Sequence, residues 1–312
     1  MSIEFSSVSK SYPDGTHAVD NFSLVIPSRK TTVFVGSSGC GKTTLLRMIN
    51  RMVDPTAGSI QIDGADIAAT EPVHLRRSIG YVMQNSGLLP HRKVIDNVAT
   101  VLFLTKVPKR AAYARALELL DTVGLDRALA NRYPGELSGG QQQRVGVARG
   151  LAADPNILLM DEPFGAVDPI VRVDLQNETR RLQRELDKTI VFVTHDIDEA
   201  FLLGDQVVIL EKGAKIAQKG SPEEILANPA SDFVANFIGA ERGKRRLTVD
   251  SNVKSKGDDL VLVDAGGYAA GVISASVISA GVISASVISA SSLGSSPKSR
   301  SVSNKTSQAG DA

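Results

Sequence analysis

The sequence predicts an α/β fold in which a core of strands and helices carries a helical subdomain. The first indication is a short apolar run at residues 33–35 that leads into a glycine-rich loop and then a helix. The second is a buried apolar run at residues 157–160 that ends in two carboxylates. Between them, residues 96–123 place Ala, Leu and charged residues at helical spacing, which predicts the inserted subdomain.

Within residues 1–240, the other elements are predicted from the period of the apolar side chains. Residues 3–8 and 19–26 alternate between apolar and polar side chains, as antiparallel strands do. The remaining expectations are strands at 59–62, 79–83 and 190–193, and helices at 42–51, 141–153 and 168–186.

Composition limits the classes of protein that the chain can represent. Its 312 residues suggest one large domain or two ordinary ones, and 42% hydrophobic residues are enough to bury a core. The formal charge of +1 gives no global field that would attract nucleic acid or an anionic membrane. Cys40 is the single cysteine, so no internal disulfide is possible, which fits a reducing cytosol.

The sequence also indicates whether the chain carries a signal peptide or a membrane-spanning segment. The N-terminus has neither the basic nor the apolar region of a signal peptide. No segment up to residue 239 is apolar for long enough to span a bilayer. If the protein works at a membrane, we therefore expect a partner to hold it there.

The character of the sequence changes after residue 240, and residues 241–270 are expected to form a linker with a partial module. The basic run at residues 242–246 favours a solvated linker over a lipid or nucleotide contact. Residues 259–268 have the pattern of a strand and a turn.

Residues 271–312 are expected to form a repetitive, Ser-rich and disordered tail. Residues 271–280 are repeated letter for letter at 281–290, with a five-residue period that matches neither a strand nor a helix. A low-complexity tract is favoured, and an aggregation-prone β segment or a segment that contacts a membrane is the alternative.

A phosphate-binding loop is predicted from the pattern G-x-x-x-x-G-K-[ST]. The residues that fit it, with the threonine that follows, are Gly36, Ser37, Ser38, Gly39, Cys40, Gly41, Lys42, Thr43 and Thr44. Glycines allow the backbone to wrap closely around phosphate oxygens, and the next helix adds its positive end. Lys42 is expected to reach the β and γ phosphates of a nucleoside triphosphate, and Thr43 to ligate Mg²⁺. A chance glycine-rich turn is the alternative, but the flanking strand and helix argue against it.

Asp161 and Glu162 are the two carboxylates that end the strand at 157–160. Ligands of open α/β sheets bind at this carboxyl edge. Asp161 is expected to hold the Mg²⁺ shell and Glu162 to polarise the attacking water as a general base. An isolated acidic pair would be read as a cap of the next turn, but the phosphate loop upstream favours the catalytic interpretation.

Residues 137–144, LSGGQQQR, narrow the class of nucleoside triphosphate-binding protein further. Ser138 and two glycines open a helix and so offer a hydroxyl, bare N–H groups and a helix dipole to a phosphate. The segment resembles the signature sequence of ABC ATPases, and the resemblance covers residues 1–240. It implies a P-loop NTPase (RecA-like) core with an antiparallel β subdomain and an α-helical signature subdomain, in a dimer that sandwiches two ATP molecules. The residues implied to contact ATP on the second copy are Ser138, Gly139, Gly140 and Gln141.

Four further residues follow the pattern of the family. Tyr12 resembles the aromatic residue that stacks on adenine, and Gln84 the glutamine that touches Mg²⁺ and senses the membrane subunit. His195 follows a buried strand and resembles the catalytic switch histidine that contacts the γ-phosphate. Asp168 matches the loop that crosses the dimer interface, although Gly165 stands where that loop commonly begins with Ser.

Several segments resemble the quaternary-amine uptake branch of the family, whose importers carry glycine betaine, carnitine or choline. They are residues 12–20, 47–51, 87–91, 164–170 and 175–176. The resemblance implies a homodimer at the cytoplasmic face of the membrane, docked on integral permease subunits and served indirectly by an extracytoplasmic solute-binding protein, with no nucleic acid. Many members carry CBS modules after the ATPase. Residues 261–271 are similar to part of one, so regulation through it is not expected to survive.

Two other functions stay open at this point. One alternative is the ATPase of an exporter, or of an importer of another solute such as an amino acid or a polyamine, because the residues that face the solute lie on other chains. An ABC ATPase that acts on DNA or ribosomes would tend to carry a long coiled coil or tandem ATPase domains. Here the phosphate loop and the signature each occur once.

Overall fold

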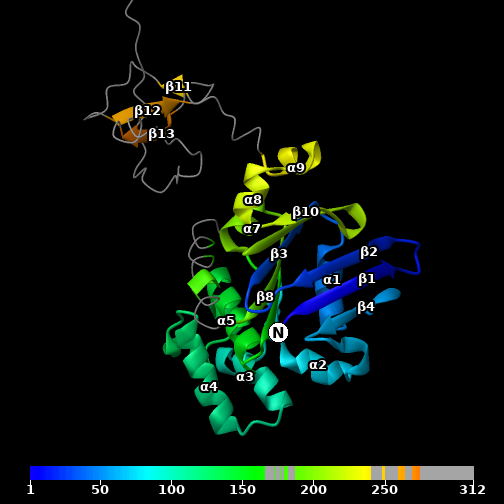
Figure 1. The fold of residues 1–312 in the computed structure, drawn as a ribbon. Helices are drawn as coiled ribbons and strands as arrows, with labels where there is room; N and C mark the ends of the chain where they lie inside the picture. The colour runs from blue at the N-terminus through cyan, green and yellow to red at the C-terminus, as the bar shows by residue number, and fades with distance from the viewer. Residues whose placement is uncertain are drawn as a thin grey trace, which may run out of the picture. The chain divides into compact units, whose positions relative to one another are not determined.

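The computed structural model describes residues 1–165, 172, 176, 179–181 and 187–239, and the backbone of strands at 248–249, 259–263 and 269–274. The chain divides into two compact units, Met1–Ile238 and Gly239–Ala312. The first unit holds the central sheet, an antiparallel sheet and the helical subdomain (Figure 1).

The central sheet of the first unit has six strands in the order β10-β9-β3-β8-β7-β6. Their bounds are β3 (Thr31–Gly36), β6 (Ile79–Val82), β7 (Ile157–Asp161), β8 (Thr189–Thr194), β9 (Gln206–Glu211) and β10 (Lys215–Gly220). All run parallel except β10, which pairs antiparallel with β9 at the edge. The carboxyl ends of β3, β7 and β8 therefore meet at one edge of the sheet.

A second sheet is antiparallel, with the strand order β2-β1-β4-β5. Its strands are β1 (Ile3–Ser11), β2 (His17–Ile26), β4 (Ala57–Ile62) and β5 (Ala65–Asp66). The helix α1 (Lys42–Ile49) lies beside these strands in Figure 1. It ends two residues before the predicted end at residue 51, because Arg51 takes a left-handed φ of +56° that a helix cannot continue.

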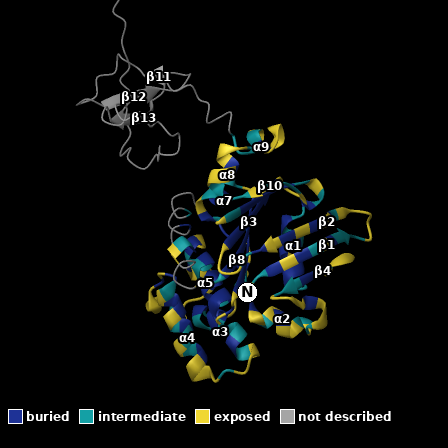
Figure 2. Ribbon diagram, viewed as in Figure 1, coloured by how far each residue is buried: buried dark blue, intermediate teal, exposed yellow. Residues whose placement is uncertain are grey.

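Two hydrophobic cores cover the faces of the central sheet. Alternate residues of β3 enter opposite cores: Val33 and Val35 belong to the core that includes α3, α4 and α5, whereas Phe34 belongs to the core that includes α1 and the antiparallel sheet. Every residue of β3, β7 and β8 is buried, and these strands are mainly dark blue in Figure 2. This explains the continuous apolar runs in the sequence, since a strand covered on both faces has no polar side to alternate with.

The helical subdomain contains α3 (Val94–Leu104), α4 (Lys109–Thr122) and α5 (Gly139–Leu151). The prediction of one continuous helical stretch over 96–123 was wrong between α3 and α4. Pro108 lacks an N–H and disfavours a helical conformation at residue 107, so the chain turns there and Lys106 takes a φ of +62°. The helix predicted at 141–153 is α5, which begins two residues earlier because the Ser138 side chain caps it.

The other helices whose bounds the structure describes in the first unit are short. They are α2 (Pro72–Ser78), α7 (Ile197–Leu203), α8 (Pro222–Ala227), α9 (Asp232–Phe237) and the 3-10 turns Ile67–Ala69, Arg127–Asn131, Pro134–Glu136 and Lys212–Ala214. Of the helix predicted at 168–186, residues 172, 176 and 179–181 are described, and all of these are helical. Among the described residues, no helix combines the length and the apolar character that a membrane span requires.

The second unit contains an antiparallel sheet in the order β11-β12-β13. Its strands are β11 (Thr248–Val249), β12 (Asp259–Val263) and β13 (Ala269–Ser274). The strand β13 includes the first four residues of the repeat, Gly271 to Ser274, whose five-residue period predicted neither strand nor helix. Val272 and Ile273 are β-branched, which favours a strand where a partner such as β12 is present.

The predicted fold class is confirmed: an α/β core carries an antiparallel β subdomain and a helical subdomain.

Candidate functional site

The predicted phosphate loop joins the carboxyl end of β3 to the start of α1. Two of its glycines are required by close approach of other backbone. A Cβ at Gly36 would lie 2.3 Å from the carbonyl oxygen of Leu210. A Cβ at Gly41 would lie 2.4 Å from that of Ala18, and Gly41 also has a φ of +111°. The loop is therefore fixed between β9 and β2 and presents its backbone outward at Ser37, Ser38 and Gly39, which are exposed.

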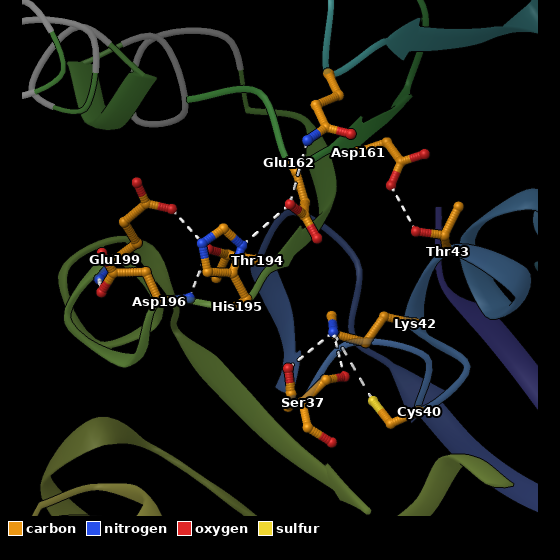
Figure 3. Close-up of polar contacts among 12 residues, drawn as sticks. Ser37, Cys40, Lys42, Thr43, Asp161, Glu162, Thr194, His195, Asp196 and Glu199 are labelled. Atoms are coloured by element: carbon orange, nitrogen blue, oxygen red, sulfur yellow. Dashed lines mark hydrogen bonds and ion pairs between the residues drawn. The ribbon is translucent and has the colours of Figure 1, made fainter. Parts of the chain in front are cut away.

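Lys42 lies inside this loop and is buried. Its ammonium donates to the carbonyl oxygens of Gly36 at 2.8 Å and Ser37 at 2.9 Å. The third close atom is the sulfur of the buried Cys40, at 3.9 Å (Figure 3). A thiol is a weak acceptor, so among the described residues one donor of the ammonium has only a weak partner.

Thr43 and Asp161 meet directly, although 118 residues separate them in sequence. The Thr43 hydroxyl donates to Oδ1 of Asp161 at 2.9 Å (Figure 3). Hydroxyl and carboxylate oxygens suit Mg²⁺, which commonly completes its shell with water and phosphate oxygens. Among the described residues, no group of three His, Cys, Asp or Glu gathers to hold a metal alone. The donor set therefore fits a cation that arrives with a phosphate ligand.

Two residues that the sequence analysis did not single out surround the same carboxylate. The hydroxyl of Tyr81 donates to Oδ2 of Asp161 at 3.0 Å, and NH2 of Arg47 lies 3.5 Å from that oxygen. Burial, together with the neighbouring Asp161 carboxylate, raises the pKa of Tyr81 to about 12. Tyr81 therefore remains protonated and acts as a donor at neutral pH.

Glu162 follows the last residue of β7 and takes a left-handed φ of +43°, which is rare for a residue other than glycine. Its N–H donates to the carbonyl oxygen of Val193 at 3.0 Å, which fixes the turn against β8. Its Oε2 lies 3.0 Å from Nδ1 of His195 and 3.5 Å from Nε2 of Gln84. Strained backbone of this kind persists where the surrounding structure holds it, and it is concentrated at functional sites.

His195 follows β8, and its imidazole points toward Glu162 in Figure 3. The turn that carries it is held by a buried carboxylate. Glu199 accepts hydrogen bonds from the Thr194 hydroxyl at 2.7 Å and from Nε2 of Gln176 at 3.1 Å. Burial raises the pKa of Glu199, against the lowering effect of these hydrogen bonds. The pattern Asp196-x-x-Glu199 at the start of α7 is the sequence signal that could have identified this support.

The predicted signature residues begin α5 on the surface. The Ser138 hydroxyl accepts from the N–H of Gln141 at 3.3 Å, and Oε1 of Gln141 accepts from the N–H of Ser138 at 3.0 Å. A Cβ at Gly139 would meet no atom within 4 Å apart from its own helix and neighbours, and Gly140 is buried. In the described part of the chain, no hydrogen bond joins Ser138 to the phosphate loop.

Tyr12 and Asp168 complete the set of predicted residues. Tyr12 is half-buried at the end of the β1 hairpin, and the ammonium of Lys10 lies 5.3 Å from the centre of its ring. Asp168 lies outside the described residues. Thr44 is half-buried on α1.

The structure thus brings the predicted residues together in three groups at one sheet edge. They are Lys42 within its loop, Thr43 with Asp161, and Gln84 with Glu162 and His195. Gln84, predicted as a metal ligand, contacts Glu162 rather than Thr43 or Asp161. Tyr12 and the Ser138 helix stand apart from these contacts.

Comparison with known proteins gives a consistent set of relatives. The model of the ABC transporter family matches residues 19–165. The choline transport ATP-binding protein OpuBA of Bacillus subtilis is 54% identical over 236 residues, 76% of this chain and 62% of the relative. The glycine betaine/carnitine/choline transport ATP-binding protein OpuCA of the same organism is 53% identical over 240 residues, 77% of this chain and 63% of the relative.

A shorter relative is covered more fully. The glycine betaine uptake system ATP-binding protein YehX of Escherichia coli is 48% identical over 250 residues, 80% of each chain. The chain spans less than two thirds of the length of OpuBA and OpuCA.

Solved structures with the same fold include two forms of a bacterial cassette. A dimeric bacterial ABC transporter cassette is 34% identical, with a TM-score of 0.64 over 70% of this chain and 98% of the other. A dimeric post-hydrolysis form of that cassette bound to ADP and phosphate is 33% identical, with a TM-score of 0.64 over the same shares.

Proposed function

The chain belongs to the family of ABC transporter ATP-binding proteins, and from this premise we propose that it hydrolyses ATP to energise the uptake of a quaternary amine. The expected resemblance to the osmoprotectant branch is confirmed by relatives named for choline, carnitine and glycine betaine transport. The observation that carries the catalytic part is the placement of Glu162 between His195 and Gln84, beside the Thr43–Asp161 pair.

In the proposed complex the phosphates of ATP lie on the loop that contains Lys42. The exposed backbone of Ser37 to Gly39 and the start of α1 face the anion. The donor of Lys42 that faces the Cys40 sulfur would turn to a phosphate oxygen, a stronger acceptor. Tyr12 would stack on the adenine, an interaction that contributes about 1–3 kcal/mol by analogy with base stacking.

Thr43 and Asp161 would hold Mg²⁺ through Oγ1 and Oδ1, the two oxygens that now share a hydrogen bond. When bound, the ion neutralises charge on the β and γ phosphates. Gln84 would join this shell through the oxygen of its amide, whose nitrogen contacts Glu162.

Glu162 would act as the general base for hydrolysis. Its carboxylate accepts a proton from water as the water oxygen bonds to the γ-phosphorus, and the bond from that phosphorus to the β–γ bridging oxygen breaks to release ADP and phosphate. His195 lies 3.0 Å from this carboxylate through Nδ1, and its other ring nitrogen would contact the γ-phosphate.

A second copy of the chain completes the site in this proposal. Ser138 and Gly139 lie at an exposed helix start, and the side of Gly139 away from its own helix is open. Glycine lowers helix stability relative to alanine, so its presence at residue 139 calls for an explanation. The approach of a phosphate from the partner copy supplies that explanation, and the similar cassette structures are dimeric.

The transported solute and the remaining partners follow from the relatives. We infer that the homodimer docks on two permease subunits at the cytoplasmic face of the membrane, with a solute-binding protein delivering glycine betaine, carnitine or choline. In the part of the chain that is described, no helix is long and apolar enough to cross a bilayer.

The catalytic proposal is tested by Glu162→Gln, which keeps the size and a hydrogen-bonding group but cannot accept the proton. We expect ATP binding to be retained and hydrolysis to fall by about 10²–10⁴-fold. Steady hydrolysis at the wild-type rate would remove Glu162 from this role.

The transport proposal is tested by reconstitution with the permease that co-purifies. Glycine betaine, carnitine and choline should stimulate hydrolysis, whereas arginine and spermidine should not. Stimulation by arginine or spermidine alone would replace the proposed solute and leave the proposed catalysis intact.

A further inference from the structure

Tyr81 makes a polar contact that the proposed hydrolysis does not use. It lies on β6, in register with Leu159 of β7. Because side chains alternate along a strand, Tyr81, Leu159 and Asp161 share one face of the sheet. That face is the one covered by α1, since Leu159 and the ring of Tyr81 belong to the core that includes Leu45 and Leu46.

The helix α1 brings two more groups to the same carboxylate. Thr43 and Arg47 are four residues apart, so they lie on one side of the helix. The Thr43 hydroxyl contacts Oδ1 of Asp161, and Arg47 NH2 approaches Oδ2 to 3.5 Å. The Tyr81 hydroxyl donates to Oδ2 at 3.0 Å.

Both oxygens of Asp161 are therefore held, Oδ1 by Thr43 and Oδ2 by Tyr81 and Arg47. A cation on Oδ1 and on the Thr43 oxygen would replace the hydrogen bond between them. The bond from Tyr81 uses the other oxygen, so it can persist with or without the cation. The side chain of Asp161 is 10% exposed, so little water is available to replace a lost partner.

We propose that Tyr81, assisted by Arg47, is a positioning residue that orients the Asp161 carboxylate for Mg²⁺. The inference rests on the proposed function, because it assumes that nucleotide and Mg²⁺ bind at this loop. Arg47 contributes less than Tyr81, since its distance is longer and its side chain is 48% exposed.

The test replaces Tyr81 with phenylalanine, which keeps the ring in the core and removes the hydroxyl. Equilibrium binding of a fluorescent ATP analogue is measured in the full chain, first in EDTA and then over a series of free Mg²⁺ concentrations. We expect the Mg²⁺ concentration for half-maximal binding enhancement to rise about tenfold in Tyr81→Phe, the lower end of effects seen when a metal ligand loses its hydrogen-bond partner. Nucleotide affinity in EDTA should not change.

Tyr113 provides a matched control. Its hydroxyl also donates to a carboxylate, Oδ1 of Asp96 at 2.5 Å, but between α3 and α4. Tyr113→Phe should leave the Mg²⁺ dependence unchanged. Arg47→Met, at a half-exposed position, should shift it in the same direction as Tyr81→Phe by a smaller factor and gives a second reading of the same carboxylate.

The outcomes separate the two proposals. If the wild-type chain shows no Mg²⁺-dependent nucleotide binding, the proposed function fails first. If it does, and Tyr81→Phe requires no more Mg²⁺ than the wild type, the positioning role is refuted while the function stands. An equal loss of affinity in EDTA and in Mg²⁺ would also refute it, because the hydroxyl would then support the loop rather than the metal ligand.

Discussion

Arg149 ties the signature helix to the loop that follows Gln84. From the last turn of α5, its guanidinium donates to the carbonyl oxygen of Gly87 at 2.6 Å and to that of Ser86 at 2.5 Å. Ser86 and Gly87 both take left-handed φ values, +51° and +57°, so this loop has a conformation that needs external support. Burial lowers the pKa of Arg149, and the hydrogen bonds to the two carbonyl groups offset the cost of burying its charge.

The cost of removing these bonds can be worked from their geometry. A hydrogen bond to a charged group contributes about 1.5–3 kcal/mol, and the partial exposure of this one favours the lower end. Two such bonds give about 3 kcal/mol for Arg149→Met, a substitution that keeps most of the stem. For a unit of this size, that corresponds to a fall in melting temperature of about 6–12 °C.

Arg144 on the same helix is the control. Its NH1 lies 3.2 Å from the carbonyl oxygen of Val123 and 3.4 Å from that of Gly124, both long contacts. Arg144→Met should therefore cost about 1 kcal/mol. Chemical denaturation and hydrogen exchange at residues 83–87 measure both variants. Equal losses in the two variants, or a loss below about 1 kcal/mol for Arg149→Met, would refute the reasoning.

Two further predictions follow from burial and close approach. Gly36→Ala should abolish nucleotide binding and lower the melting temperature, because the new Cβ would lie 2.3 Å from the Leu210 carbonyl oxygen; unchanged binding in a titration would count against this packing. Glu199 has a folded-state pKa raised above 4.5, so the folded state holds this proton more tightly than the unfolded state. The unfolding free energy should therefore decline as the pH rises from 4.5 through the folded pKa. Glu199→Gln cannot ionise and should lack this part of the decline in denaturant titrations across pH; identical pH profiles in both chains would contradict it.

The sequence predicted the parts of the site whose signals are local. The loop around Lys42 needs only a strand, spaced glycines and a helix, all of them adjacent in the chain. Asp161 and Glu162 were identified for a similar reason, since an apolar run that ends in carboxylates can be recognised without knowing which strands lie beside it. The sequence of one chain does not show that Ser138 lies apart from the phosphate loop. The expectation that it contacts ATP on a second copy came from the family resemblance.

The contacts that were missed depend on strand order and register. Tyr81 reaches Asp161 because β6 lies next to β7 and pairs with it at Leu159, which the sequence of neither strand specifies. Glu199, which supports the turn that carries His195, also accepts a hydrogen bond from Gln176, 23 residues earlier in the chain. The break at Pro108 is different, because proline is a local signal that could have divided the helical stretch correctly.

The proposed mechanism depends on ATP held between two copies of this chain. The most direct measurement is the mass of the isolated Glu162→Gln chain by light scattering, with saturating ATP and Mg²⁺ and then with ADP. We predict a dimer with ATP and a monomer with ADP, and we predict that adding Ser138→Arg prevents pairing by blocking the helix start. A chain that stays monomeric with ATP, or a Ser138→Arg chain that pairs as well as its parent, would contradict the account.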